Sequence, residues 1–332
     1  MKLPTRRCSA VFLALTMAAL VASNAGIVAA RPASQQAAPA PEILASNAFY
    51  YYADVEAAWR FYSDVLGFET AADYGFAKIM RVAPASYLTL VEAARGMHSA
   101  EEPKTATLAI VTDEVEQWFE HLQEHEVPMR HELGEVDPEA AHVGFVAVDP
   151  EGYLLEFERF QPHPENDELL PLLESVEPLY PGTGALTSRP AHLGVRGIVQ
   201  WLYFADTEAT LDFYGRVLGE PALLDQGWAW AFQVSASGFL GIVDGARGLH
   251  SATEEKGVTM SFIVWDIEAW YDRLRGINDF EWRSDAIGDE SGLVRVFVGY
   301  DPEGYFLEWD EFLDLEGNEN LIPALRAARA TR

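Results

Sequence analysis

The sequence is poor in cysteine and in basic side chains. Cys8 is the only cysteine in 332 residues, so the chain beyond it contains neither a thiol nor a disulfide. Lysine and arginine together number 23, against 52 aspartates and glutamates, and the formal net charge is −29. Because an acidic surface repels phosphate groups, this balance argues against nucleic acids and anionic membranes as partners.

Sequence motifs of several reaction classes are also missing. Beyond residue 30 the chain has no phosphate-binding loop, dinucleotide fingerprint, nucleophile elbow or histidine-rich metal motif. No function of those classes is therefore indicated.

The N-terminal segment has the pattern of an export signal. Its apolar run, Val11 to Val21, is shorter than the roughly 20 residues that a transmembrane helix needs. The run follows a basic region and precedes a small-residue cleavage site, Val28-Ala29-Ala30. We predict a signal peptide over residues 1–30, a flexible tether over 31–45, and a periplasmic or secreted protein with no stable membrane insertion after cleavage.

A unit of roughly 110 residues occurs twice in register, which is the signature of a duplicated fold. Asp149-Pro150-Glu151-Gly152-Tyr153 recurs as Asp301-Pro302-Glu303-Gly304-Tyr305, and Arg95-Gly96-Met97-His98 recurs as Arg247-Gly248-Leu249-His250. The offset is 152 residues in both cases. Positions kept in both copies are expected to serve the fold, and positions that differ are where two sites would specialise. The duplication also favours a monomer, because it can replace a dimer.

The apolar patterning divides each copy into two βαβββ units. In the first copy a strand over 49–53 leads into a helix over 55–66, and the pattern restarts with a strand at Thr105. We predict modules over 46–160 and 197–313, a proline-rich linker over 161–196 and a C-terminal tail over 314–332. In the last hairpin, a tight turn at Pro302-Glu303 would place Arg295 opposite Asp310.

This order of motifs resembles the vicinal oxygen chelate superfamily, which includes glyoxalase I, bleomycin-resistance proteins, fosfomycin-resistance enzymes and extradiol dioxygenases. The resemblance rests on Asp54, Phe61-Tyr62, Leu66-Gly67 and the segment from Asp149 to Glu156, all of which recur 152 residues later. It implies an α+β fold of four βαβββ units, forming two glyoxalase-like modules whose curled mixed sheets enclose a cavity. Phe61, Tyr62 and Leu66 are expected in the core.

The resemblance also implies where a metal would bind. Metal enzymes of the family place His, Gln or Glu on the first and last strands of each unit, facing the cavity. The corresponding residues here are Asn47, Leu90, Thr107 and Glu156 in the first copy, and Val199, Ile242, Thr259 and Glu308 in the second. Aliphatic side chains cannot ligate a metal, and one carboxylate does not hold a catalytic ion. We expect no metal and no cofactor; a divalent metal is the alternative.

Strand alternation gives a second view of the cavity. It places Glu156 and Glu158 on one face of the closing strand, and Glu308 and Asp310 on the same face in the second copy. The same parity sets Phe49 and Tyr51, and likewise Trp201 and Tyr203, beside the cavity. Such a pocket suits a small organic molecule with a flat apolar body and a donor or cationic group. The alternative is that the aromatic rings fill the space.

Glu156 and Glu308 are the catalytic candidates, as general bases; the competing interpretation is a satisfied carboxylate at a sheet rim. The predicted ligand-binding residues are Asn47, Phe49, Tyr51, Leu90, Thr107, His98, Trp201, Tyr203, Thr259 and His250. The two histidines lie in loops and could equally form capping hydrogen bonds, with Arg95 and Arg247 in local salt bridges. His142 has Val294 as its counterpart, and any asymmetry between the copies would have to use such differences.

Three functions fit these observations. The first is an exported tandem glyoxalase-like protein that binds a small organic molecule without the family metal. The second is a metal-dependent lyase, isomerase or dioxygenase of the same superfamily with other ligands. The third is a non-catalytic structural or interaction module.

Overall fold

A computed structural model describes residues 39–330, and its elements follow the duplicated pattern. The strands of the first copy are β1 (Ile43–Tyr52), β2 (Glu69–Asp73), β3 (Ala77–Ala83), β4 (Ser86–Glu92), β5 (Ala106–Val111), β6 (Met129–His131), β7 (His142–Val148) and β8 (Leu154–Phe160). Those of the second copy are β9 (Gly197–Phe204), β10 (Leu224–Asp225), β11 (Ala229–Gln233), β12 (Gly238–Asp244), β13 (Val258–Val264), β14 (Glu281–Trp282), β15 (Gly288–Glu290), β16 (Val294–Tyr300) and β17 (Phe306–Phe312).

Short helices connect and cover these strands. They are α1 (Val55–Arg60), which continues as a π-helix over Phe61–Val65, then α2 (Val115–Glu124), α3 (Leu169–Ser175), α4 (Thr207–Leu218), α5 (Ile267–Leu274) and α6 (Leu321–Ala330). Asp54, Asp206 and Asp266 begin three of them, each accepting a hydrogen bond from the amide three residues later. The predicted α+β fold of four βαβββ units is confirmed. None of the helices in the described part of the chain is both long and apolar enough to span a bilayer.

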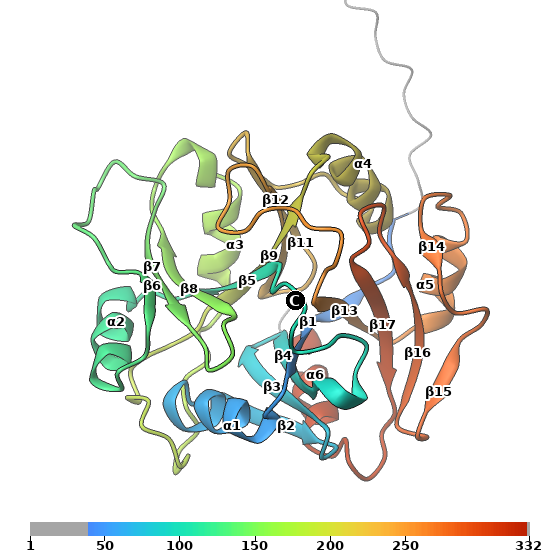
Figure 1. Cartoon of the computed structure of the whole chain (residues 1–332), viewed down its shortest axis with the longest axis horizontal. Helices are drawn as coiled ribbons and strands as arrows, with labels where there is room; N and C mark the ends of the chain where they lie inside the picture. The colour runs from blue at the N-terminus through green and yellow to red at the C-terminus, as the bar shows by residue number, and fades with distance from the viewer. Residues whose placement is uncertain (1–38, 331–332) are drawn as a thin grey trace, which may run out of the picture. The chain divides into compact units, whose positions relative to one another are not determined.

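The strands form two mixed sheets, and each sheet joins strands from both copies (Figure 1). One sheet has nine strands, in which β1 to β4 continue through a β1–β13 pairing into β14, β16 and β17. The other has eight, with the order β10-β11-β12-β9-β5-β8-β7-β6. The first unit of one copy therefore shares a sheet with the second unit of the other. The sequence indicates the four units but not this exchange.

The repeated Asp-Pro-Glu-Gly-Tyr motif ties the two sheets together. The Glu151 carboxylate accepts hydrogen bonds from the backbone amides of Ala53 and Asp54, both at 2.8 Å. The Tyr153 hydroxyl accepts one from the amide of Tyr51 at 2.9 Å. The corresponding residues of the second copy make the same bonds. The motif joins the two strands of a hairpin in one sheet, β7 and β8 in the first copy, and binds the end of a strand in the other sheet, so it serves the fold.

The helices cover one face of each sheet and bury the main core there. Tyr62, Leu66 and Tyr214 are buried in it, as expected from their helix positions. Phe213 is fully buried, whereas its counterpart Phe61 is only partly buried at the start of the π-helix. The core prediction is confirmed except that Phe61 lies at its edge.

The segments predicted as linker and tail are a further pair of repeated elements. Helices α3 and α6 begin 152 residues apart, at Leu169 and Leu321. Each follows a buried asparagine, Asn166 or Asn318, whose side-chain amide donates to two backbone carbonyls. The helices pack on the faces of the sheets that the other helices leave open. The duplicated unit is therefore longer than the sequence analysis recognised.

Two further boundaries differ from expectation. Strand β1 begins at Ile43, inside the predicted tether, while the predicted signal peptide lies outside the described residues. In the last hairpin Arg295 pairs with Glu311 rather than with Asp310. The turn has three residues instead of two, with Gly304 at φ +90°, and this extra residue shifts the register by one. Arg295 thus points away from the cavity and forms a 2.6 Å ion pair with Glu311.

Candidate functional site

The face of each sheet opposite the main core is hollowed into a pocket. The His142 pocket, of about 300 Å³, lies on the eight-stranded sheet. Its walls include His142, Glu156, Glu158, Trp201, Tyr203, Trp228 and Arg247. The Val294 pocket, of about 590 Å³, lies on the nine-stranded sheet. Its walls include Phe49, Tyr51, Phe76, Arg95, Glu290, Val294, Glu308 and Asp310. Each pocket thus takes residues from both copies.

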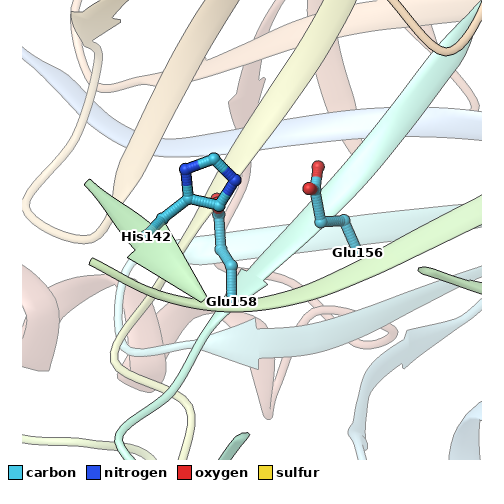
Figure 2. Close-up of side chains that lie close together, drawn as sticks. All are labelled: His142, Glu156 and Glu158. Atoms are coloured by element: carbon cyan, nitrogen blue, oxygen red, sulfur yellow. The ribbon is translucent and has the colours of Figure 1, made fainter. Parts of the chain in front are cut away.

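The polar centre of the His142 pocket is a cluster on the β7–β8 hairpin. His142, Glu156 and Glu158 each offer one ligand atom, and these atoms lie within 4.8 Å of one another. Figure 2 shows the three side chains rising from the same side of the hairpin. The register explains this, because Gly144 pairs with Glu158 and Val146 with Glu156. Gly144 adds no side chain between the imidazole and the carboxylates.

Burial makes the two glutamates unusual acids. The side chain of Glu158 is 3% exposed, and its Oε1 atom has no hydrogen-bond partner. Burial raises the pKa of Glu156 to about 7, and burial together with the nearby Glu156 carboxylate raises the pKa of Glu158 well above its usual range. Burial lowers the pKa of His142, and the charge of Glu165 opposes this effect. Both carboxyl groups therefore hold a proton to a higher pH than a solvated glutamate does.

The rest of the pocket wall is aromatic. Trp201 is 8% exposed and lies against Gly241, where an added Cβ would approach the indole ring to 2.0 Å. The Tyr203 hydroxyl is 2.8 Å from Thr107 Oγ1, which fixes its ring in the wall. Arg247 stacks on Trp228, with 5.3 Å between the guanidinium carbon and the ring centroid. The pocket thus has an apolar wall, a carboxyl pair and one exposed cation.

The Val294 pocket repeats this plan with different polar groups. Tyr51 hydrogen-bonds to Thr259 at 2.7 Å, as Tyr203 does to Thr107. Asp310 accepts a hydrogen bond from Ser261 Oγ at 2.6 Å, and burial raises its pKa to about 7. Burial and the Asp310 carboxylate raise the pKa of Glu308 well above its usual range. Among the described residues that line this pocket, none is a histidine.

The predicted faces of the strands are found for most candidate residues. Glu156 and Glu158, Glu308 and Asp310, and the four aromatic residues Phe49, Tyr51, Trp201 and Tyr203 all line pockets. Leu90 and Ile242 do not, because they point into the helix-covered core. The predicted register of strands β4 and β12 is therefore wrong by one residue. Their neighbours Thr89 and Gly241 occupy the cavity side, beside Phe49 and Trp201.

The remaining candidates support the walls rather than line them. Asn47 accepts a hydrogen bond from Thr89 at 3.0 Å and is itself buried, with its Nδ2 atom unpartnered. Val199 belongs to the cluster of buried residues beneath Trp201. His98 forms a 2.7 Å contact with Glu102 and lies edge-on to Tyr51, and His250 lies edge-on to Tyr203. Neither histidine lines a described pocket, so a direct ligand contact for them stays a prediction.

The structure places Arg95, Arg247 and His142 at the pockets, which was not predicted from the sequence. Arg95 and Arg247 were expected in local salt bridges, but they stack on Phe76 and Trp228 at the pocket mouths. The sequence signal that could have identified them is that both copies keep an arginine followed by a glycine at this position. The sequence marks His142 as a difference between the copies and as one of the residues to test as a ligand if the protein holds a metal. Its place beside the glutamates depends on the hairpin register, which a two-residue turn would set one residue too short.

Comparison with known proteins points in one direction. The profile of the Glyoxalase/Bleomycin resistance protein/Dioxygenase superfamily matches residues 45–157. The chain is similar to glyoxalase I from Zea mays, with 15% identity, a TM-score of 0.55, and coverage of 86% of this chain and 96% of that one. It is also similar to a "putative dioxygenase" from Bacillus subtilis, with 14% identity, a TM-score of 0.57, and coverage of 83% and 86%. At these identities the likeness concerns the fold alone. No curated protein matches the chain.

Proposed function

We propose that this chain, a member of the glyoxalase/bleomycin resistance/dioxygenase superfamily, is an exported protein that binds a small organic molecule in its His142 pocket. The observation that carries the proposal is the carboxyl pair of buried Glu158 and partly buried Glu156 beside an aromatic wall. A buried carboxylate oxygen without a partner is costly, and a ligand that supplies the hydrogen bond would relieve that cost. The pocket is therefore suited to a ligand rather than to packing alone.

The wall defines the chemical class of the ligand. Trp201 and Trp228 present flat apolar surface, which suits an aromatic or similarly planar body. Glu158 Oε1 needs a donor, such as an ammonium or hydroxyl group. Arg247 is exposed beside Trp228 and would donate hydrogen bonds to a carboxylate or another acceptor at the pocket mouth. A planar molecule with a donor at one end and an acceptor at the other meets all three demands.

The same carboxyl pair gives the pocket a capacity for proton transfer. A carboxyl group with a pKa near 7 is about half deprotonated at neutral pH, which is the condition that favours general-base catalysis. The Glu156 carboxylate would then take a proton from carbon or oxygen next to a ligand carbonyl. The proposed function does not require this step, because binding alone uses the same groups.

The positions at which metal enzymes of the family hold their ion do not fit a metal in this pocket. On the cavity side, Glu156 pairs across the sheet with Ala109, and Ala109 in turn with Val199. The closing strand β12 presents Gly241 there. Methyl, isopropyl and hydrogen cannot ligate, and one carboxylate does not hold a catalytic ion. We propose that the ligand binds without a metal at those positions.

Tryptophan fluorescence tests the binding proposal directly, since Trp201 and Trp228 line the pocket. Mature protein would be titrated with phenylalanine, with phenethylamine and with phenylacetate, in the presence of a chelator. Saturable quenching is expected, strongest for the probe that carries both charges. Glu158→Gln and Arg247→Ala should each weaken it, whereas Glu308→Gln in the other pocket should not. Absence of saturable binding by all three probes to folded protein would contradict the proposal.

We also propose a location, a class of partner and an oligomeric state for the protein. The predicted signal peptide supports a periplasmic or secreted location. The acidic balance of the chain favours a small molecule over nucleic acid or an anionic membrane. The pairing of units from both copies within each sheet supports a monomer, because the exchange that a dimer would supply already occurs within one chain. Sedimentation of the exported protein would test the last point.

A further inference from the structure

We propose that His142, Glu156 and Glu158 bind one divalent transition-metal ion, at a place that metal enzymes of the family do not use. The site lies on the β7–β8 hairpin, toward the mouth of the His142 pocket. It shares only Glu156 with the family positions, and its other two ligands come from a strand pair rather than from strands of different units. The inference deepens the proposed function, because ion and organic molecule would occupy the same pocket.

The spacing of the three side chains is close to what an ion requires. Their ligand atoms lie within 4.8 Å of one another. Ligands at the usual 2.0–2.2 Å from a metal are separated from each other by roughly 3 to 4 Å. All three side chains point to the same side of the hairpin, so a closer approach of their ligand atoms requires them to rotate toward one another (Figure 2).

The charge of the cluster lacks compensation without an ion. Glu158 is 3% exposed, and its Oε1 atom has no hydrogen-bond partner. No lysine or arginine forms a salt bridge with Glu156 or Glu158 in the part of the chain that the structure describes. Two neighbouring carboxylates, one buried and one partly buried, repel each other without a cation, and a divalent ion would neutralise both. The unpartnered Oε1 atom of Glu158 therefore supports a bound ion independently of the spacing of the three side chains.

The types of ligand atom select the class of ion. Imidazole nitrogen with two carboxylate oxygens suits zinc, manganese, iron or nickel in the divalent state. Calcium and magnesium prefer oxygen alone, and cuprous ions prefer sulfur. Three protein ligands would leave room for water or for an oxygen of the organic molecule.

The Val294 pocket provides an internal control. Val294 replaces His142, Val296 replaces Gly144, and Asp310 already accepts a hydrogen bond from Ser261. It has buried Asp310 and partly buried Glu308, but the nitrogen ligand and the space around it are missing. We expect the ion in the His142 pocket alone.

Isothermal titration of chelator-treated mature protein with zinc chloride, and separately with nickel chloride, tests the site. One ion per chain is expected, with magnesium failing to compete. His142→Ala should weaken binding by about 100-fold or more, since even a residue that only orients a ligand contributes 10–100-fold. Because His142 is exposed, its variant should unfold at the same denaturant concentration as the wild type. Glu158→Gln should act like His142→Ala, and the matched variant Glu308→Gln should leave binding unchanged.

The outcomes separate this inference from the proposed function. Folded protein that binds neither zinc nor nickel, or that binds them equally well after His142→Ala, overturns the site. Saturable quenching by phenylalanine in chelator would then still support the organic ligand. Zinc binding that depends on His142, in a protein that quenches with none of the organic probes, supports the site and contradicts the proposed function.

Discussion

The two pockets of this protein were built from one duplicated unit and differ where a ligand would sit. Both have a wall tyrosine hydrogen-bonded to a threonine, a pair of acidic side chains of which one is buried, and an arginine stacked on an aromatic ring. The His142 pocket is the smaller, at about 300 Å³ against about 590 Å³. Trp201 stands in it where the other pocket has Phe49, and His142 stands where the other has Val294.

The repeated residues that serve the fold are the ones whose contacts agree in both pockets. The glutamate and tyrosine of the Asp-Pro-Glu-Gly-Tyr motif accept the same backbone-amide hydrogen bonds in both copies, and the motif lines neither pocket. The wall residues differ on several strands, with His142 on β7 against Val294 on β16 and Trp201 on β9 against Phe49 on β1. The joints between the sheets are thus shared by the copies, and the pocket walls are not.

The largest expected effect comes from shortening a buried leucine of helix α3 or α6. Leu173 in α3 and Leu325 in α6 are buried at equivalent places, one behind each pocket. Substitution of either by alanine should lower the free energy of unfolding by about 2–5 kcal/mol. Denaturant melts check this. A cost below about 1 kcal/mol for one of them would show that the two helices are not equivalent.

A smaller effect is expected from Gly241→Ala, which affects the His142 pocket alone. The new Cβ would lie 2.0 Å from the Trp201 ring, so the indole must move. Overpacking of this kind costs about 1–3 kcal/mol. The matched change, Thr89→Ser, keeps the hydroxyl that bonds Asn47 and should cost less than about 1 kcal/mol. Equal costs in the two pockets would argue against the indole filling the space over Gly241.

The contribution of the buried acids to stability should rise as the pH falls from about 8 to about 5, while histidines whose pKa values burial lowers, such as His98 and His121, contribute in the opposite direction. The pKa values of Glu156 and Asp310 are raised to about 7 in the folded protein, so the native state binds protons that the unfolded state releases. Stability from a raised carboxyl pKa is present at low pH and is lost as the pH rises through that value, with a slope of about 1.4 kcal/mol per pH unit for each proton.

Glu156→Gln and Asp310→Asn should each remove part of the stability that the protein gains as the pH falls, which is measured as the difference between variant and wild-type unfolding free energies in denaturant. Zinc should change the pH profile only through the His142 pocket, because the ion would displace protons from the carboxyl groups there. A difference between variant and wild type that does not change with pH over this range would contradict the role of the buried acids.

The smallest expected effect is a weak second ion gained by transplanting the site. Val294→His together with Val296→Gly gives the Val294 pocket the nitrogen ligand and the space beside it. Titration with zinc should then show a second, weaker site. Val294→His alone should show less, because Val296 stays between the imidazole and Asp310. Failure of the double variant to bind a second ion, while folded, would mean that the acids of the two pockets are not equivalent.

Much of the fold could be predicted from sequence because its signals are local. Aspartate caps such as Asp206 begin helices, strand alternation places Glu156 and Trp201 on cavity faces, and the constant offset reveals the duplication. The exchange of units between sheets could not be predicted, because β1 pairs with β13 across some two hundred residues and no local pattern records the partner.

The candidate site was predictable only in part. The acids and aromatic rings followed from alternation, but the place of His142 followed from the register of a hairpin. That register depends on one extra turn residue, Gly152, whose positive φ allows a three-residue loop. Arg247 was treated as a salt-bridge partner because a loop residue has no periodicity from which its direction can be read. Its stacking on Trp228 is a tertiary contact.

The central claim is that one of two duplicated pockets holds the functional centre, at His142, Glu156 and Glu158. The most direct test is a crystal structure of the mature protein soaked in zinc, with anomalous scattering recorded on both sides of the zinc edge. The account predicts one anomalous peak between His142, Glu156 and Glu158, and none beside Val294, Glu308 and Asp310. Peaks of equal height in both pockets, or a peak only beside Glu308, would contradict it.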